Sequence, residues 1–232
     1  MSYILLIETA TETCCIALAL KDKVVAQRLV TKQKAHAGVI NVFIKEVLQD
    51  AGIDFDKLDA IAVSSGPGSY TGLRIGVSTA KGLCFAIDKP LIAIDTLLSY
   101  AHQYYIENKS SLIHPQNTLF IPMIDARRME VYTAVYNQNF ETIVKVNALV
   151  LQEDSFLEYE NKFDLHFFGD GAPKIKSFLK EKASIIVKEN FIPNAAGMSV
   201  LAHNKLLKQE YENLAYFEPF YLKDFVTQSK FR

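Results

Sequence analysis

The feature that most constrains the fold is a succession of predicted elements that occurs twice along the chain. Short apolar or alternating runs predict strands, because successive side chains of a strand point to opposite faces of a sheet. Longer stretches with apolar residues three or four positions apart predict helices. The first half contains, in order, strands at 3–8, 14–20 and 24–31, a helix at 37–51, a strand at 60–65, a helix at 71–86, a strand at 91–95 and a helix at 96–108.

The second half repeats this order, with strands at 118–125, 129–137 and 140–151, a helix at 153–160, a strand at 164–170, a helix at 172–182, a strand at 184–189 and a helix at 195–209. Three antiparallel strands followed by alternating helices and strands predict a mixed sheet with helices on its faces. Two copies in tandem predict a two-lobed α/β protein with a cleft between the lobes. This is the duplicated ribonuclease-H-like plan of actin-like and HSP70-type (ASKHA) proteins. The polar stretch 107–117 separates a predicted N-terminal lobe, 1–108, from a predicted C-terminal lobe with its tail, 109–232.

Composition limits the classes of function. The chain has 232 residues, half of them apolar, and a net charge of −1, so a packed core is expected. A protein that held an RNA or DNA backbone by itself would carry a clear basic excess. The cysteines form no CxxC pair, the start has no basic region before its apolar run, and no stretch of 18 apolar residues occurs. The expectation is a cytoplasmic protein with neither a membrane span nor a disulfide framework.

The segment 63–76, VSSGPGSYTGLRIG, holds four glycines between a predicted strand and a predicted helix. Thr71 stands where the dinucleotide-binding fingerprint has glycine, and the segment lacks the Gly-Lys-Ser/Thr of a P-loop. A tight turn around Pro67 is the alternative to a phosphate site. Within the helix, small residues recur every four positions, at Gly72, Gly76 and Ala80, and so form a strip of bare backbone on one side. The strip predicts close approach of another element, either the protein's own sheet, which the residues favour, or a partner helix.

An acid ends the first strand of each half. Threonines follow Glu8 at positions 9, 11 and 13, and Asp125 lies in the turn IDARRMEVY. Actin-like ATPases hold metal and phosphate at such a place, whereas the alternative here is an acid that caps a turn. Candidate contacts for an anion are Arg127, Arg128 and Lys223, and the alternative is that these charges are simply solvated. The five histidines form no HxxxH or HxxH pair, so the local sequence predicts no zinc site.

Four segments together resemble the bacterial TsaB (YeaZ) family. They are ILLIETATETCCIAL near the start, SSGPGSYTGLRIGVSTAKGL in the first half, IDARRMEVYTAVY in the second half and EPFYLKD near the end. The resemblance implies the actin-like fold and a role in making N6-threonylcarbamoyladenosine next to the anticodon of tRNAs that read codons starting with A. TsaB-like proteins are paralogues of the catalytic subunit TsaD and share its glycoprotease-type domain.

The resemblance also implies a role without catalysis. TsaD holds a metal through an HxxxH pair, and the matching positions here are Thr96 and Tyr100, which implies no catalytic residue, metal or cofactor in this chain. The implied role is a scaffold that binds TsaD through helices 37–51 and 71–86, with the ATPase TsaE joining and tRNA reached through the complex. A homodimer through the same surface is implied for the chain alone. The implied interface residues are Ile40, Phe43, Val47, Gly72, Gly76 and Ala80.

The alternative hypothesis is an enzyme in its own right, either an ATPase or a metal-dependent glycoprotease-type peptidase. Its basis is the cleft predicted between the lobes, with Glu8 and Asp125 near the floor of that cleft. This hypothesis predicts that the isolated chain binds a nucleotide or a metal ion.

Overall fold

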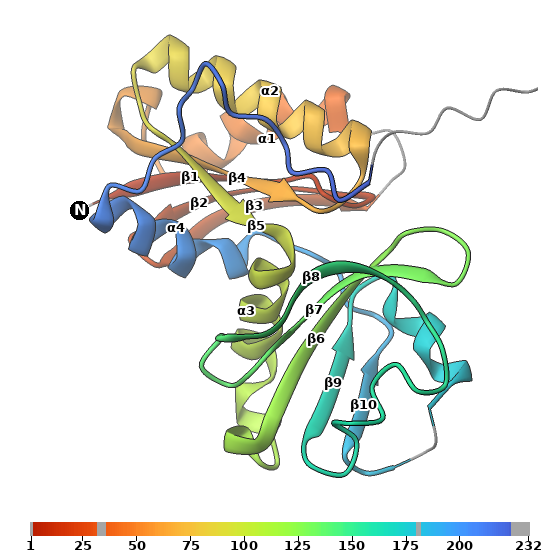
Figure 1. Cartoon of the computed structure of the whole chain (residues 1–232). Coiled ribbons are helices and arrows are strands. Elements are labelled where there is room, and N and C mark those ends of the chain that lie inside the picture. The colour runs from red at the N-terminus through yellow and green to blue at the C-terminus, as the bar shows by residue number, and fades with distance from the viewer. Residues whose placement is uncertain (1, 32–35, 180–181, 224–232) are drawn as a thin grey trace, which may run out of the picture.

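Two five-stranded mixed sheets form the framework of the computed structural model, which describes residues 2–31, 36–179 and 182–223 (Figure 1). The first sheet has the strand order β3-β2-β1-β4-β5. Its first three strands pair antiparallel, and β4 and β5 run parallel to β1. The strands are β1 (Tyr3–Glu8), β2 (Thr13–Leu20), β3 (Lys23–Thr31), β4 (Leu58–Gly66) and β5 (Leu91–Asp95).

The second sheet has the order β10-β9-β6-β7-β8, which is the order of the first sheet read from its other edge. Here too the first three strands pair antiparallel and the last two run parallel to the first of them. The predicted duplication into two α/β lobes is therefore confirmed. The strands are β6 (Thr118–Asp125), β7 (Glu130–Tyr136), β8 (Thr142–Val150), β9 (Asp164–Phe168) and β10 (Ile185–Lys188).

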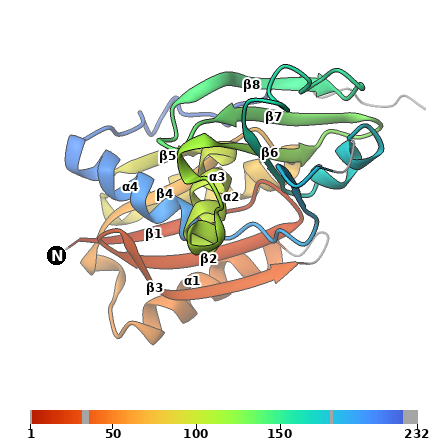
Figure 2. The same ribbon diagram turned by 90° about the horizontal axis from the view of Figure 1, so that it is seen from below.

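Four helices cover the first sheet, two on each face: α1 (His36–Asp50) and α2 (Tyr70–Ile87) on one, and α3 (Thr96–Asn108) and α4 (Ala196–Lys208) on the other. The alternation of β1 determines both layers, since Leu5 and Ile7 pack with α1 and α2, whereas Ile4 and Leu6 pack with α4. Figure 2 shows α3 and α4 side by side on their face of the sheet. Helix α3 also packs against the second sheet and so joins the two lobes.

Helix α4 comes from the second half of the chain, yet it contacts β1, β3, β4 and β5 of the first sheet. Residues 209–223 continue from it along the first lobe (Figure 1). Helix α4 and the segment that follows it thus help to cover the first sheet, while the lobe boundary at residue 108 stays a prediction. Among the described residues, no helix has the length and apolar character needed to cross a membrane.

Two helices predicted in the second half are wrong. Residues 153–160 form successive turns, in which the Ser155 amide donates to the Gln152 carbonyl and the Leu157 amide to the Asp154 carbonyl. The segment predicted as a helix at 172–182 contains only a 3-10 helix, η4 (Ala172–Ser177), and residues 180–181 lie outside the described part of the chain. A helix shorter than about 12 residues is marginal without a packed apolar face, and each segment is short.

Candidate functional site

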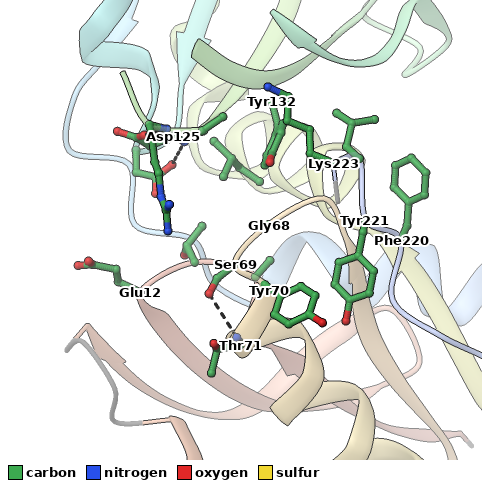
Figure 3. Close-up of a pocket in the computed structure, with 18 of the residues that line it drawn as sticks. Glu12, Gly68, Ser69, Tyr70, Thr71, Asp125, Tyr132, Phe220, Tyr221 and Lys223 are labelled. Carbon is green, nitrogen blue, oxygen red and sulfur yellow. Dashed lines mark hydrogen bonds between the residues drawn. The ribbon is translucent and has the colours of Figure 1, made fainter. Parts of the chain in front are cut away.

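A cleft of about 950 Å³ lies between the two lobes (Figure 3). Its walls come from the turn after β1, the glycine-rich loop after β4, the turn after β6 and the tail of the chain. Three of these segments follow the carboxyl ends of strands, where open α/β sheets usually bind ligands. The volume is also in the range of small-molecule sites. The segments are 10–12, 68–72, 124–127 and 220–223.

The glycine-rich loop uses its backbone amides within the chain. The Gly66 amide donates to Thr96 Oγ1 at 3.1 Å, and the Ser69 amide donates to the Ala10 carbonyl at 2.6 Å. Ser69 also caps α2, because its Oγ accepts from the Gly72 amide at 3.2 Å. A phosphate cradle needs such amides to point at the ligand. The amides of Gly66 and Ser69 instead hold the loop against the start of α3 and the turn after β1.

The glycine strip of α2 faces the interior of the first lobe. A Cβ added at Gly72 would overlap the Thr9 carbonyl oxygen, and one at Gly76 would overlap Thr9 Oγ1. Ala80 is fully buried in the core between the helices and the sheet. The strip therefore lets α2 approach the protein's own β1–β2 turn, which corrects the expectation that Gly72, Gly76 and Ala80 admit a partner helix.

The interface residues predicted on α1 also face the interior of the first lobe. Ile40 and Val47 are buried in the core, and the half-buried Phe43 packs against that core. An amphipathic helix on a sheet turns its apolar stripe inward, so these residues are not on the outer face. A partner on α1 would instead meet its exposed side, which includes Ala37, Asn41 and Val42.

Glu8 is fully buried beneath the cleft and does not line it. Its Oε1 accepts from the Ala10 amide at 2.7 Å, and its Oε2 has no hydrogen-bond partner among the described residues. Burial raises the pKa of Glu8 to about 7, although the hydrogen bond from the Ala10 amide and the nearby polar groups of Ser64 and Thr9 act in the opposite direction. Glu8 thus changes charge near neutral pH inside the protein.

Asp125 does line the cleft, and its Oδ1 accepts from the Arg127 amide at 2.6 Å and from Lys174 Nζ at 2.8 Å. Asp170 lies beside it and accepts from the Asp125 amide at 3.0 Å. Asp170 is exposed to the cleft, and desolvation by the neighbouring protein raises its pKa to about 6. The carboxylates of Asp125 and Glu12 raise it further. Acids therefore predominate at this wall.

The basic residues predicted as anion contacts lie around the turn after β6. Arg127 and Arg128 are both exposed and have left-handed backbones, with φ of 70° and 47°. Arg127 lines the cleft, and Lys223 forms an ion pair with Glu130 at 2.5 Å. Contact of these cations with an anion stays a prediction.

No group of three or more His, Cys, Asp or Glu side chains that could hold a metal ion occurs among the described residues. Thr96 and Tyr100, which the sequence resemblance placed opposite the metal pair of TsaD, contact other parts of this chain. Thr96 is buried and accepts from the Gly66 amide, and Tyr100 is buried in the core beside Phe191. Both side chains thus serve the packing of α3 against its neighbours.

The sequence interpretation missed several residues of the cleft, notably Asp170, Tyr132 and Phe220. Asp170 comes just after the end of β9, as Asp125 ends β6, so the strand-end rule that found Asp125 would also have found Asp170. Phe220 has no comparable signal, because only the folded path of the tail brings it to the cleft.

The two sheets of matching topology and the cleft at their strand ends define a two-lobed protein of the actin-like class. Two solved structures agree: YeaZ from Pseudomonas aeruginosa has a TM-score of 0.80 and 26% identity over 96% of this chain and all of that one. The activator of 2-hydroxyisocaproyl-CoA dehydratase from Clostridium difficile, with bound ADPNP, has a TM-score of 0.50 at 10% identity, over 91% of this chain and 98% of that one. The second likeness shows the fold alone.

Sequence relatives give the family. The family model described as TsaD, tRNA N6-adenosine threonylcarbamoyltransferase, matches residues 24–231. The tRNA threonylcarbamoyladenosine biosynthesis protein TsaB of Haemophilus influenzae is 27% identical over 98% of this chain and 96% of its own, and TsaB of Bacillus subtilis is 30% identical over 83% and 80%. A transferase from Novosphingobium aromaticivorans is 37% identical, but over only 44% of this chain and 35% of its own. The chain belongs to the TsaB (YeaZ) family.

Proposed function

We propose that this chain takes part in the synthesis of N6-threonylcarbamoyladenosine in tRNA as a non-catalytic subunit that binds and stabilises the transferase TsaD. The observation that carries the proposal is the match to TsaB proteins over nearly the full length of both chains, whereas the TsaD relative matches over about a third of its own length. A role on tRNA places the proposed activity in the cytoplasm.

The contacts of α3 support a role without catalysis. A metal at the matching positions would need two His, Cys, Asp or Glu ligands one helical turn apart. Thr96 and Tyr100 instead supply a hydroxyl that holds the glycine-rich loop and a ring that fills the core. We therefore assign metal binding and the transfer step to TsaD.

We place the contact with TsaD on the outer faces of α1 and α2. A groove of about 350 Å³ runs between these helices, and its lining includes Asn41, Arg74 and Ser78. Further along α2, Phe85 is 83% exposed, and a Cβ added at Gly82 would meet no atom within 4 Å. An exposed aromatic ring beside bare helix surface suits a partner helix, since buried aromatic residues dominate the energy of many interfaces.

The proposal includes three further partners: TsaE, tRNA and a second copy of this chain. The ATPase TsaE joins the assembly of this chain with TsaD, and tRNA is reached through the complex. When the chain is alone, a second copy takes the place of TsaD on the same helix faces. A two-fold homodimer places one patch against itself, which is the commonest form of oligomer. Sedimentation with and without TsaD tests the exchange, and a dimer that persists at saturating TsaD contradicts it.

Reconstitution tests the function. TsaD, TsaE, the enzyme that forms threonylcarbamoyl-adenylate and tRNA are combined with and without this chain, and the modified adenosine is quantified by mass spectrometry. We expect modification to depend on the chain. Equal modification without it overturns the proposal.

The variant Phe85→Ser tests the surface. Loss of a central aromatic side chain typically costs about 2 kcal/mol or more, so we expect the dissociation constant for TsaD to rise about thirtyfold. The matched control is Ile113→Ser, because Ile113 is 73% exposed but lies in the loop between α3 and β6. Equal affinities of the two variants, measured by titration calorimetry, would place the contact elsewhere.

The stand-alone ATPase or metal-dependent peptidase stays the alternative, and the cleft between the lobes is the observation that favours it. Calorimetric titration of the isolated chain with magnesium-ATP and with zinc tests it directly. Binding of either at micromolar concentration would support the alternative, and we expect none.

A further inference from the structure

The tail after α4 crosses the first lobe, and its last described residues, 220–223, line the cleft (Figure 1). Its Glu212 amide donates to the Leu91 carbonyl of the edge strand β5 at 2.9 Å. Lys81 of α2 then donates from Nζ to the Phe217 carbonyl at 2.9 Å, and the Phe220 amide donates to the Ser65 carbonyl at 2.7 Å. The tail thus contacts β5, α2 and the end of β4 in turn.

At the mouth of the cleft the tail is held by side chains of α2. Tyr221 packs on Tyr70 with ring centroids 4.8 Å apart, and the two rings lie side by side in Figure 3. Arg74 lies 4.1 Å over the Tyr70 ring and donates from Nε to the Tyr221 hydroxyl at 3.1 Å. The tail also approaches the glycine-rich loop so closely that a Cβ at Gly66 would overlap the Phe220 carbonyl oxygen.

The next residues reach the second lobe. Lys223 Nζ contacts both carboxylate oxygens of Glu130, at 2.6 and 2.5 Å, and Glu130 begins β7. Residues 220–223 therefore connect the loop after β4 with the second sheet, across one wall of the cleft. We name this four-residue segment the latch.

Arg74 links the latch to another surface, because it also lines the groove between α1 and α2. Its bond to Tyr221 joins a guanidinium to a neutral hydroxyl. A carboxylate placed in the groove would form the stronger pair, since charge-assisted bidentate bonds of arginine exceed those to neutral acceptors. One side chain thus serves both the cleft wall and the helix faces.

We propose that the latch closes one side of the cleft in the free chain and is released when an acidic group of a partner on the α1–α2 faces takes Arg74 away from Tyr221. The release step rests on the proposed function, which supplies the partner. Closure in the free chain does not depend on it. The two statements therefore have separate tests.

Hydrogen exchange of the free chain tests closure. Tyr221→Phe removes only the hydroxyl that accepts from Arg74 and keeps the ring on Tyr70. Loss of one such bond is expected to speed deuterium uptake of peptides covering 217–223 about fivefold. The control is Arg28→Met, which removes an arginine paired with α1 at the opposite edge of the first sheet. Unchanged uptake in Tyr221→Phe overturns the latch.

Hydrogen exchange of the wild-type chain in the presence of TsaD tests whether the partner releases the latch. We expect peptides from the outer faces of α1 and α2 to gain protection, while uptake at 217–223 rises to the level of Tyr221→Phe. If α1 and α2 gain protection but uptake at 217–223 does not change, release of the latch is refuted and the proposed function stands. If α1 and α2 gain no protection, the proposed docking surface is refuted. The measurement on the free chain still decides whether the latch closes the cleft.

Discussion

Replacement of the buried Glu8 by glutamine should make the protein more stable at neutral and alkaline pH and leave its stability near pH 4.5 little changed. Glu8 is fully buried, with one carboxylate oxygen bonded to the Ala10 amide and the other without a partner among the described residues. Glutamine keeps the acceptor for that amide and has no charge at any pH. The variant therefore isolates the free energy of the buried charge.

The magnitude follows from the raised pKa. In the folded chain the pKa of Glu8 rises from 4.5 to about 7, mainly because burial disfavours the charged form. Below pH 4.5 the carboxyl is protonated in both states and has no effect on stability. As the pH rises from 4.5 to about 7 the unfolded chain loses this proton first, so the free energy of unfolding falls by about 3 kcal/mol, at about 1.4 kcal/mol for each pH unit. Above pH 7 the loss stays constant.

Urea denaturation at intervals from pH 4.5 to 8.5, followed by circular dichroism, measures this effect. Other groups titrate in the same range, so the informative quantity is the difference between Glu8→Gln and the wild type at each pH. That difference should grow by about 3 kcal/mol up to pH 7 and then remain level. Glu12→Gln, in the next turn, controls for the loss of a carboxylate. A difference that is the same at pH 5 and pH 8 refutes the raised pKa.

Two further predictions concern the glycine-rich segment. Gly76→Ala should lower the free energy of unfolding by about 1–3 kcal/mol, because the added Cβ meets Thr9. Gly82→Ala, on the open side of α2, should raise it by up to about 1 kcal/mol. Equal thermal melting temperatures of the two variants would contradict the packing of the strip. Thr96→Val leaves the buried Gly66 amide without its acceptor and should cost about 1–3 kcal/mol by the same assay, so an unchanged melting temperature would show that this bond contributes little.

The sequence predicted the strands better than the helices of the second half. Alternation and short apolar runs mark a strand locally, and all ten strands were expected near their observed bounds. The predicted helices 153–160 and 172–182 failed because a short helix depends on the surface against which it packs. Helix α4 was predicted at almost its observed bounds, but its place under the first sheet depends on long-range contacts with β1 and β5.

Some features of the candidate site could likewise be predicted from the sequence, and others could not. Motif arguments found Asp125 and the glycine-rich loop, since both follow strands, and they separated the loop from phosphate-binding motifs. The structure shows which way the strip on α2 faces, because the carbonyl and hydroxyl oxygens of Thr9 fill the space beside Gly72 and Gly76. Periodicity places residues on one side of a helix, but it does not say what lies against that side.

The same packing bears on the choice between the proposed role of the outer surface and the alternative of chemistry in the cleft. The sequence drew attention to the acid at the end of β1 and to two residues at the start of α3. Here Glu8 is sealed beneath the cleft, Thr96 holds the glycine-rich loop and Tyr100 fills the core. These three side chains therefore face the interior of the lobe, whereas Asp125 and Asp170 still line the cleft. Among the described residues, the exposed ring of Phe85 and the open surface at Gly82 have no such internal contacts, so the Phe85→Ser variant tests the outer surface without disturbing the core.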